Sequence, residues 1–403
     1  MISELTLGRK IELMRRRRGL SRQALAALVG YSAEWLRQVE KDQRRPDKLS
    51  ALLRVADVLR VDDVASFLGV TTATPTAGPD PRTASAAIRK ALFGMTGPGD
   101  GGTEQATVTD QLRTAWSDWR DARWRYSVLQ HRLPWLLTAA SALAGPATGR
   151  DAVAQHRAVA EVHRLAAAFL SQVNDLPLAL LTAERAVASA AQTGDPAVHA
   201  ACEGGLAAVL LRLGRIQESA DLCRTAAGRL GTDTPSGPRS AVATWGAVHL
   251  TAATVSAAAG EQLTAYELLD RARAAAARLP SEDTVPGCSC GDFGRAAVDV
   301  QGICLEVILG HTRRALRTAA RVDLAEAEFR STRSRYYLTL ARAHARQRDA
   351  AAATFALLRT ERVSPEEVVF NSEARDLIQL VLRQDDATVR HEMWRLAERA
   401  RLV

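Results

Sequence analysis

The side chains of residues 33–41 have types and spacing suited to paired hydrogen bonds with flat polar groups. Arg37 presents a rigid fork of donors, Gln38 carries a donor beside an acceptor, and an ionised Glu34 only accepts. These patterns match the major-groove edges of guanine, adenine and cytosine respectively, and each good pair contributes ~1–3 kcal/mol of discrimination between bases. At 100° per residue, the three side chains and Lys41 fall on one side of a helix. The spacing therefore predicts an exposed polar face that has a partner to contact.

Three short helices are predicted to position this face. The first runs from Leu7 into an arginine run and ends at Gly19, a residue suited to a helix C-terminus. The second covers roughly 22–29 with the Ser21 hydroxyl as its cap, and the third follows a similar cap at Ser32. Because the second and third helices are joined by a turn of about four residues that contains glycine, they are predicted to form a helix-turn-helix.

The other side of the third helix is apolar and is expected to face the second. The pattern predicts a small core that contains Leu25, Leu28, Leu36 and Val39. Trp35 lies on the flank of this stripe, where half-buried packing is favoured over contact with a thymine methyl or a sugar. Apolar residues at helical spacing after Arg45-Pro46 complete an expected five-helix domain over residues 1–68.

Positive charge is concentrated at the same end of the chain. Residues 1–63 hold 14 Lys and Arg against 9 Asp and Glu, a net charge of +5, and the other 340 residues carry the remaining +3 of the formal +8. A compact basic unit on a nearly balanced body is typical of a phosphate-binding domain joined to a part with another role. Docking of a protein on the helix-turn-helix is the minority interpretation.

A series of residues between Leu20 and Leu59 has both the identities and the spacing of a known domain. It comprises Leu20-Ser21-Arg22-Gln23-Ala24-Leu25-Ala26, Gly30-Tyr31-Ser32, Leu36, Val39-Glu40-Lys41, Arg45-Pro46, Leu53, Ala56 and Leu59. The segment resembles the Xre-type DNA-binding domain of phage-repressor-like regulators, in which the third helix lies in the DNA major groove.

The resemblance implies two groups of contacts. Residues of the third helix face base edges, and arginines at the start of the second helix and in the turn after the third face phosphates. The base-edge group is Ala33, Glu34, Arg37 and Gln38, and the phosphate group is Arg22, Arg44 and Arg45. With neighbouring side chains included, the candidate DNA-binding residues are Arg22, Ser32, Ala33, Glu34, Trp35, Arg37, Gln38, Lys41, Arg44 and Arg45.

Two positions match the family's intradomain ion pair, Arg15 and Glu40, and are therefore excluded from base reading. Two others depart from the family pattern. Arg22 replaces the usual glutamine and adds a phosphate ligand, and Asp42 replaces a glycine and must adopt the left-handed conformation, which Asp tolerates better than most residues.

The rest of the chain is predicted to be helical, because alanine supplies much of its apolar content. Residues 69–104 are rich in Thr, Pro and Gly and are expected to form a flexible linker, with a short helix over 84–93 that could dock on either domain. Residues 105–403 carry turn signals about 40–50 residues apart, at Asn174-Asp175, Gly214-Arg215, Gly260-Glu261, Gly310-His311 and Arg348-Asp349. Small residues recur after each turn, as stacked helix pairs require, so the fold class is all-α with a C-terminal α-solenoid.

One of these units resembles a degenerate tetratricopeptide repeat, at Leu210, Leu213, Gly214, Ala220 and Ala227. An Xre-type domain joined to such repeats resembles a large class of actinomycete regulators and the peptide-sensing repressors of other Gram-positive bacteria. The resemblance implies a homodimer on a twofold-symmetric DNA operator. It also implies a peptide or small-molecule effector in the groove of the repeats.

Two further clusters could do chemistry. Trp116, Trp119, Trp124, Tyr126 and Trp135 could form a ligand cage, but an apolar face that seats the first hairpin is favoured. Cys288 and Cys290, with Cys304 and His311, could supply a Cys₃His zinc set or a redox sensor. The Cys-X-Cys spacing is too short for the usual pattern, and Cys304 falls in a predicted helix, so incidental thiols are the default.

Enzyme classes are not favoured. The sequence lacks a phosphate-cradling glycine loop, an H-E-x-x-H helix and a G-x-S-x-G elbow, and no cofactor is expected. No membrane span or secretory leader is predicted, so a cytoplasmic location is expected. The sequence thus predicts an effector-sensing, sequence-specific transcriptional regulator. The alternatives are a repeat-based scaffold or antagonist and a thiol or metal sensor through Cys288 and Cys290.

Overall fold

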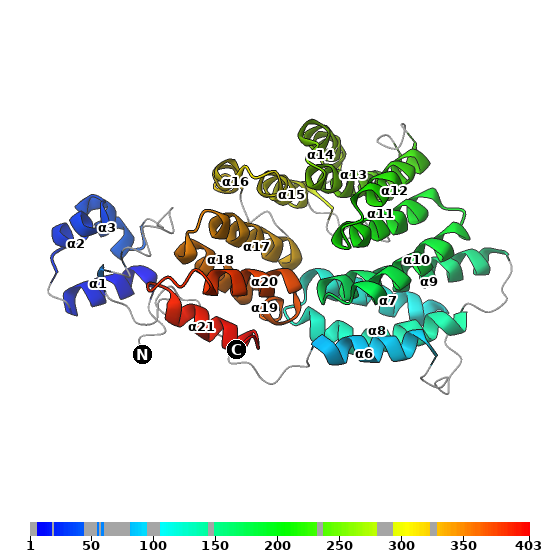
Figure 1. The fold of residues 1–403 in the computed structure, drawn as a ribbon, viewed down its shortest axis with the longest axis horizontal. Helices are drawn as coiled ribbons and strands as arrows, with labels where there is room; N and C mark the ends of the chain where they lie inside the picture. Colours follow the sequence, from blue (N-terminus) through cyan, green and yellow to red (C-terminus); the bar gives the residue numbers. More distant parts are fainter. Residues whose placement is uncertain are drawn as a thin grey trace.

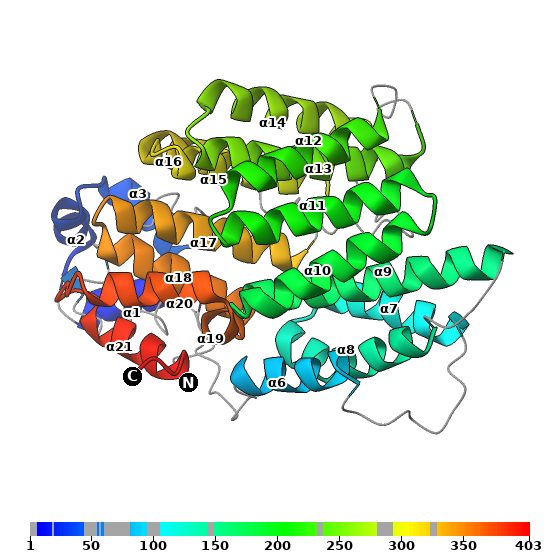
Figure 2. The same cartoon turned by 45° about the vertical axis from the view of Figure 1, so that its right-hand side comes forward.

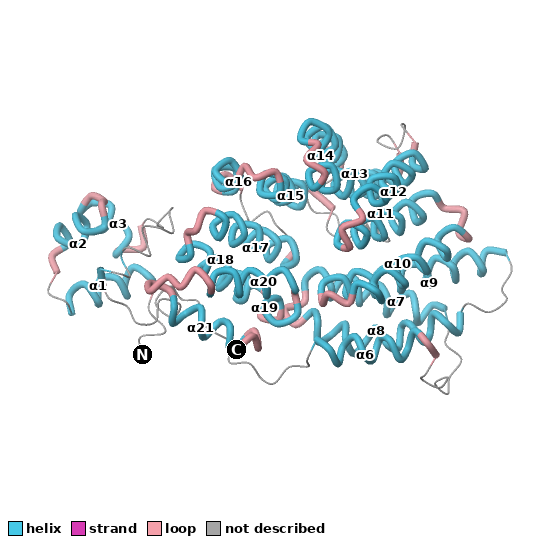
Figure 3. The backbone as a smooth tube through the Cα atoms, viewed as in Figure 1, coloured by secondary structure: helices cyan, strands magenta, loops and turns pink. Residues whose placement is uncertain are grey.

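The structure of the chain is a computed structural model. It describes residues 6–17, 20–43, 55, 58–59, 81–94, 105–143, 149–231, 237–279, 293–322 and 329–403. Every regular element in these ranges is a helix (Figures 1 and 3), which confirms the all-α fold class. The helix-turn-helix lies at one end of the molecule in Figure 1, beside the C-terminal helices of a larger helical body.

The three N-terminal helices begin and end close to where the sequence predicts. They are α1 (Leu7–Arg17), α2 (Arg22–Val29) and α3 (Ala33–Glu40). The Ser21 hydroxyl accepts a hydrogen bond from the Ala24 amide at 3.0 Å, and Ser32 accepts from Trp35 at 3.1 Å, so both predicted caps form. Gly30 ends α2 in the left-handed conformation, which a glycine adopts without strain.

The core of this domain differs from the prediction at one leucine. Leu25, Leu36 and Val39 are buried as expected, but the side chain of Leu28 is 61% exposed. The prediction for Leu28 was wrong because the buried stripe of the two-turn helix α2 runs from Leu25 to Val29, four positions apart. Leu28, three positions after Leu25, lies beside this stripe and faces solvent. Val55 and Leu59 join the same core, and Val58 packs against it. Apart from these three residues, the fourth and fifth predicted helices fall outside the described residues.

The body consists of helices paired mostly into antiparallel hairpins. Three helices precede the first hairpin: α6 (Pro81–Leu92), α7 (Gln105–Asp121) and α8 (Arg125–Leu143). Five hairpins follow: α9 (Gly149–Gln172) with α10 (Leu176–Ala191), α11 (Pro196–Arg212) with α12 (Ile216–Leu230), α13 (Arg239–Ala258) with α14 (Gln262–Ala276), α15 (Arg295–Ile308) with α16 (Thr312–Ala319), and α17 (Arg330–Arg346) with α18 (Ala350–Val363). The chain ends in α19 (Glu367–Phe370), α20 (Ser372–Leu382) and α21 (Arg390–Arg399).

All five predicted turns occur between the two helices of a hairpin. Each contains one residue with positive φ, which lets the chain reverse within a few residues; these residues are Asn174, Gly214, Gly260, Gly310 and Arg348. Small residues are buried where the helices pack together, as predicted; examples are Ala179, Ala183 and Ala186 of α10. In α12 the buried stripe is Ser219, Cys223 and Ala226, so Ala220 and Ala227 lie at its edge.

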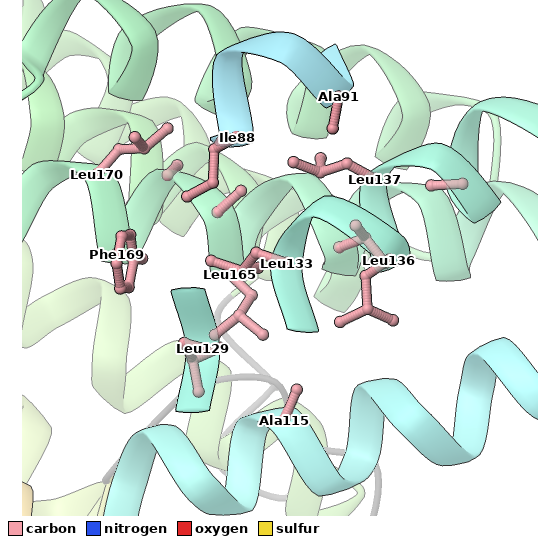
Figure 4. Packing of buried hydrophobic residues seen from close by; sticks show 14 of the residues in the cluster. Ile88, Ala91, Ala115, Leu129, Leu133, Leu136, Leu137, Leu165, Phe169 and Leu170 are labelled. Carbon is pink, nitrogen blue, oxygen red and sulfur yellow. The ribbon is translucent and has the colours of Figure 1, made fainter. Parts of the chain in front are cut away.

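The short helix expected within the linker is part of the body. Ile88 and Leu92 of α6 are buried in the same core as Leu133 and Leu137 of α8 (Figure 4). Arg185 of α10 donates to the Leu92 carbonyl at 3.1 Å, which fixes the end of α6. Residues 81–94 therefore contain the short helix expected within the linker, and this helix docks on the body, one of the two domains that the prediction left open.

The two ends of the row of hairpins meet. Near the junction, Arg125 at the start of α8 lies 2.5 Å from the carboxylate of Glu367 in α19, and both side chains are buried. The neighbouring Glu366 accepts from the Tyr126 and Ser127 amides, which caps α8 from the far end of the sequence. At the other side of this seam, Arg330 donates to Asp121. The segment that includes α19 thereby packs against α8, and the start of α17 packs against α7, near the middle of the molecule in Figure 2.

One described helix, α13, is long and apolar enough to cross a membrane on length and composition alone. Within its apolar window, 56% is buried inside the protein, as in a core helix of a globular protein.

Candidate nucleic-acid interface

The polar face predicted for α3 is at the surface. Ser32, Glu34 and Lys41 are exposed, and Ala33, Arg37 and Gln38 are half-buried. On the opposite side, Leu36 and Val39 are fully covered. The helix is therefore amphipathic in the sense that the sequence predicts, and its polar side is open along two turns.

Glu34 organises this face. Its carboxylate accepts from Arg37 at 2.7 Å (Nε to Oε2) and 2.6 Å (Nη2 to Oε1), and from Gln38 Nε2 at 3.1 Å. The hydrogen bonds from Arg37 hold the pKa of Glu34 at about 2, so the carboxylate is ionised at neutral pH. Arg37, which is suited to read guanine, and Gln38, which is suited to read adenine, are thus both held by Glu34, which is suited to read cytosine.

Trp35 belongs to the core. Its side chain is 8% exposed and stacks on Tyr31, with ring centroids 4.2 Å apart. This placement agrees with the favoured packing role and leaves little of the indole for a base or sugar. The residue holds α3 against the turn that precedes it, where it positions the polar face instead of contributing to it.

Arg22, expected to face a phosphate, is engaged within the domain. Its Nε donates to Glu40 Oε2 at 2.6 Å, and this hydrogen bond raises the pKa of the Arg22 guanidinium. Arg15 donates to the other oxygen of the same carboxylate, also at 2.6 Å. The predicted Arg15–Glu40 ion pair is confirmed, and it has a third member. About a third of the Arg22 side chain is still exposed, at the edge of the domain.

Asp42 adopts the left-handed conformation that its position demands, with φ 55°. Its carboxylate also accepts from the Thr6 hydroxyl at 2.5 Å and the Gly8 amide at 3.2 Å, which satisfies one of the free backbone donors at the start of α1. A Cβ at Gly8 would lie 2.2 Å from the Val39 carbonyl oxygen, so only glycine allows this approach. The departure from glycine at 42 therefore gives the domain a cap between α1 and α3, which spacing alone does not indicate.

The remaining predicted contacts are not placed. Arg44 and Arg45 lie outside the described residues, as does Arg18 of the arginine run. Of the other arginines in that run, Arg16 pairs with Glu12 at 2.7 Å on the domain surface.

The tryptophan cluster is divided between core and surface. Tyr126 is fully buried, whereas Trp124 and Trp135 are exposed. Trp116 and Trp119 pack on the core and also line a cavity in the body. The structure therefore supports the packing role for Tyr126, Trp116 and Trp119, and it also places Trp116 and Trp119 on the wall of a cavity.

The thiols of the described chain have the features of structural residues. Burial raises the pKa of Cys202 and of Cys223 to about 12 and also raises that of Cys304, so these thiols stay protonated and unreactive. Cys304 lies on α15, as expected. Within the described ranges, no three His, Cys, Asp or Glu side chains gather as a metal site. Cys288 and Cys290 fall outside these ranges.

One comparison with known proteins agrees with the N-terminal geometry. A family model described as a helix-turn-helix domain matches residues 6–66. No curated protein matches the chain. A crystal structure of Bacillus thuringiensis PlcR in complex with the peptide PapR7 and DNA overlaps 83% of this chain and 94% of that one, at a TM-score of 0.30 and 12% identity. The N-terminal part of the chain is a helix-turn-helix domain.

Proposed function

We propose that this protein is a sequence-specific DNA-binding transcriptional regulator of the Xre-type, actinomycete class. One observation carries the proposal: α3, in a segment that matches a helix-turn-helix family, exposes Glu34, Arg37 and Gln38 side by side. These groups can bind base edges in the major groove, where every base pair presents a distinct pattern. The basic excess of the first 63 residues supports contact with phosphates.

The proposed active form is a homodimer on an operator with twofold symmetry. Two copies of α3 would enter successive major grooves, so the half-sites would be centred about 10 bp apart. The helical body would provide the dimer contact. A regulator of this kind acts on chromosomal DNA in the cytoplasm.

The body is proposed as the sensing domain, with residues 1–68 as the DNA-binding domain and the segment between them as a tether interrupted by α6. An effector in the body would change the curvature of the hairpins or the dimer contact, and thereby the spacing of the DNA-binding domains. The seam at Arg125 and Glu367 is the place where such a change in curvature must be accommodated.

Binding titrations of full-length variants on specific and random DNA, at several salt concentrations, test the proposal. Gln38→Ala and Arg37→Ala should lower the preference for the specific site. Arg45→Ala should weaken binding to all DNA about equally and flatten the salt slope. Arg113→Ala on α7 removes an exposed positive charge far from the interface and serves as the control. Equal effects of the three interface substitutions on specific and random DNA would refute the assignment.

A further inference from the structure

The inner helices of the body surround a cavity of about 350 Å³. It is lined by residues of α7 and by residues of, or just before, the first helix of each of the five hairpins, namely α9, α11, α13, α15 and α17. This volume is at the small end of the range for ligand pockets, which fits a compact molecule better than an extended peptide.

The walls of the cavity are aromatic on two sides. Trp116 and Trp119 of α7 line it, and Phe293 lines it just before α15. The Phe293 ring occupies the space that a side chain at Gly246 would take, since a Cβ there would lie 2.0 Å from the ring. Glycine at 246 thus allows an aromatic ring to lie on α13. Between the aromatic residues, Gly204, Gly205 and Ala208 of α11 leave room for a ligand.

Among the described residues, the charge of the lining is positive. These residues include Arg164 and Arg335 and no acidic side chain. Arg164 stacks on Trp116, 4.2 Å from the ring centroid, and pairs with Glu161 at 3.1 Å, so its charge is largely balanced. Arg335 is exposed, and the described part of the chain offers it no carboxylate partner. Arg335 is therefore the cation available to a bound anion.

We propose that this cavity binds a small organic anion with an apolar or aromatic body, whose acidic group pairs with Arg335 and whose body lies against Trp116, Trp119 and Phe293. This names the chemical class of the effector and so rests on the proposed function for its biological meaning. Polar groups for orientation are present, because Gln301 donates to the Thr254 hydroxyl at 2.7 Å within the lining. An aromatic body with one acidic group is the shape that such a lining complements.

The test compares two fluorescent probes with full-length protein in the absence of DNA. The probes are 8-anilinonaphthalene-1-sulfonate, which is anionic, and N-phenyl-1-naphthylamine, which has the same kind of body without charge. Arg335→Gln should weaken binding of the anionic probe about 3- to 10-fold and leave the neutral probe unchanged, because only the anion loses a charge-assisted contact. Arg271→Gln, an exposed arginine of α14 outside the lining, is the matched control and should change neither.

A second variant tests the location. Ala208 lines the cavity but is exposed, so Ala208→Trp fills the space without displacing core atoms and should abolish binding of both probes. Circular dichroism melting checks that each variant is folded. Equal loss of both probes in Arg335→Gln, or unchanged binding in Ala208→Trp, would overturn the proposal. Stronger displacement of the probe by a long apolar peptide than by 2-naphthoate would overturn the assignment to a small molecule. DNA plays no part in these readouts, so failure of the proposed DNA-binding function would be detected separately.

Discussion

Arg22 Nε donates to Glu40 Oε2 across 2.6 Å and joins the start of α2 to the end of α3. Arg15 occupies the other oxygen of the same carboxylate. One buried carboxylate between two guanidinium groups therefore links α1, α2 and α3 beside their shared apolar core. An arginine that the resemblance assigns to DNA also has a structural role.

Glu40→Ala should destabilise the N-terminal domain by about 3 kcal/mol, because it leaves the buried Arg15 guanidinium without its counter-ion. The stability of the N-terminal domain can be measured by urea unfolding with amide exchange of the α2 and α3 residues as the readout. Glu12→Gln removes a carboxylate that pairs with the exposed Arg9 and Arg16 and lies 3.7 Å from Arg22, and it should cost less than about 1 kcal/mol. Equal stability losses in the two variants would contradict the central role of Glu40.

Glu34→Ala should raise the affinity for random DNA about threefold, because it releases Arg37 and removes a negative charge from the surface that meets phosphates. The ratio of specific to random binding should fall, since Arg37 and Gln38 lose the carboxylate that orders them. Fluorescence anisotropy with both DNAs reads these values. If random-DNA affinity does not change, Glu34 does not restrain Arg37 in the free protein.

Glu367→Ala should lower the stability of the body by about 3 kcal/mol, since the buried Arg125 loses its partner where the last helices meet the first. Glu373→Ala is the control, because its pair with Arg342 is partly exposed and should contribute about 1 kcal/mol or less. Differential scanning calorimetry of both variants gives the comparison. A Glu367→Ala variant that melts like the control would show that the seam does not hold the superhelix closed.

Acid should weaken the body in part through His163 of α9. Burial lowers the pKa of this imidazole, whose Nδ1 lies 2.9 Å from the Val159 carbonyl oxygen. The unfolded chain binds the proton more tightly, so the contribution of His163 to stability is complete above a pH of about 6.5 and is lost as pH falls below that value. The free energy of unfolding, measured with urea, should fall less between pH 7.5 and pH 5.5 in His163→Asn than in the wild type. His131→Asn, at an exposed site, should keep the wild-type difference, and a similar result for both variants would exclude His163.

Local signals in the sequence predicted much of the fold. The helix caps at Ser21 and Ser32 and the five turns of the body depend on residues that act on their own neighbours, so they can be identified without knowledge of the tertiary structure. The sequence predicted the short helix within the linker but left open which domain it docks on, because the docking of Ile88 depends on a distant core that local composition does not encode.

The candidate sites divide in the same way. The polar face of α3 follows from helical periodicity, and the i, i+3 spacing of Glu34 and Arg37 is a signal from which their pairing could have been predicted. The cap from Asp42 to α1, the seam at Glu367 and the cavity beside Arg335 join residues from separate helices. No spacing along the chain encodes these contacts, because they depend on how the helices pack.

Selection of binding sites from random duplex DNA by the full-length protein, carried out in parallel with Gln38→Ala, tests most directly whether α3 reads bases. If α3 reads bases, the wild-type protein should select a motif with two half-sites about 10 bp apart, and Gln38→Ala should select a motif that has lost its preference at one position in each half-site. A wild-type selection without a motif, or the same motif from both proteins, would contradict it.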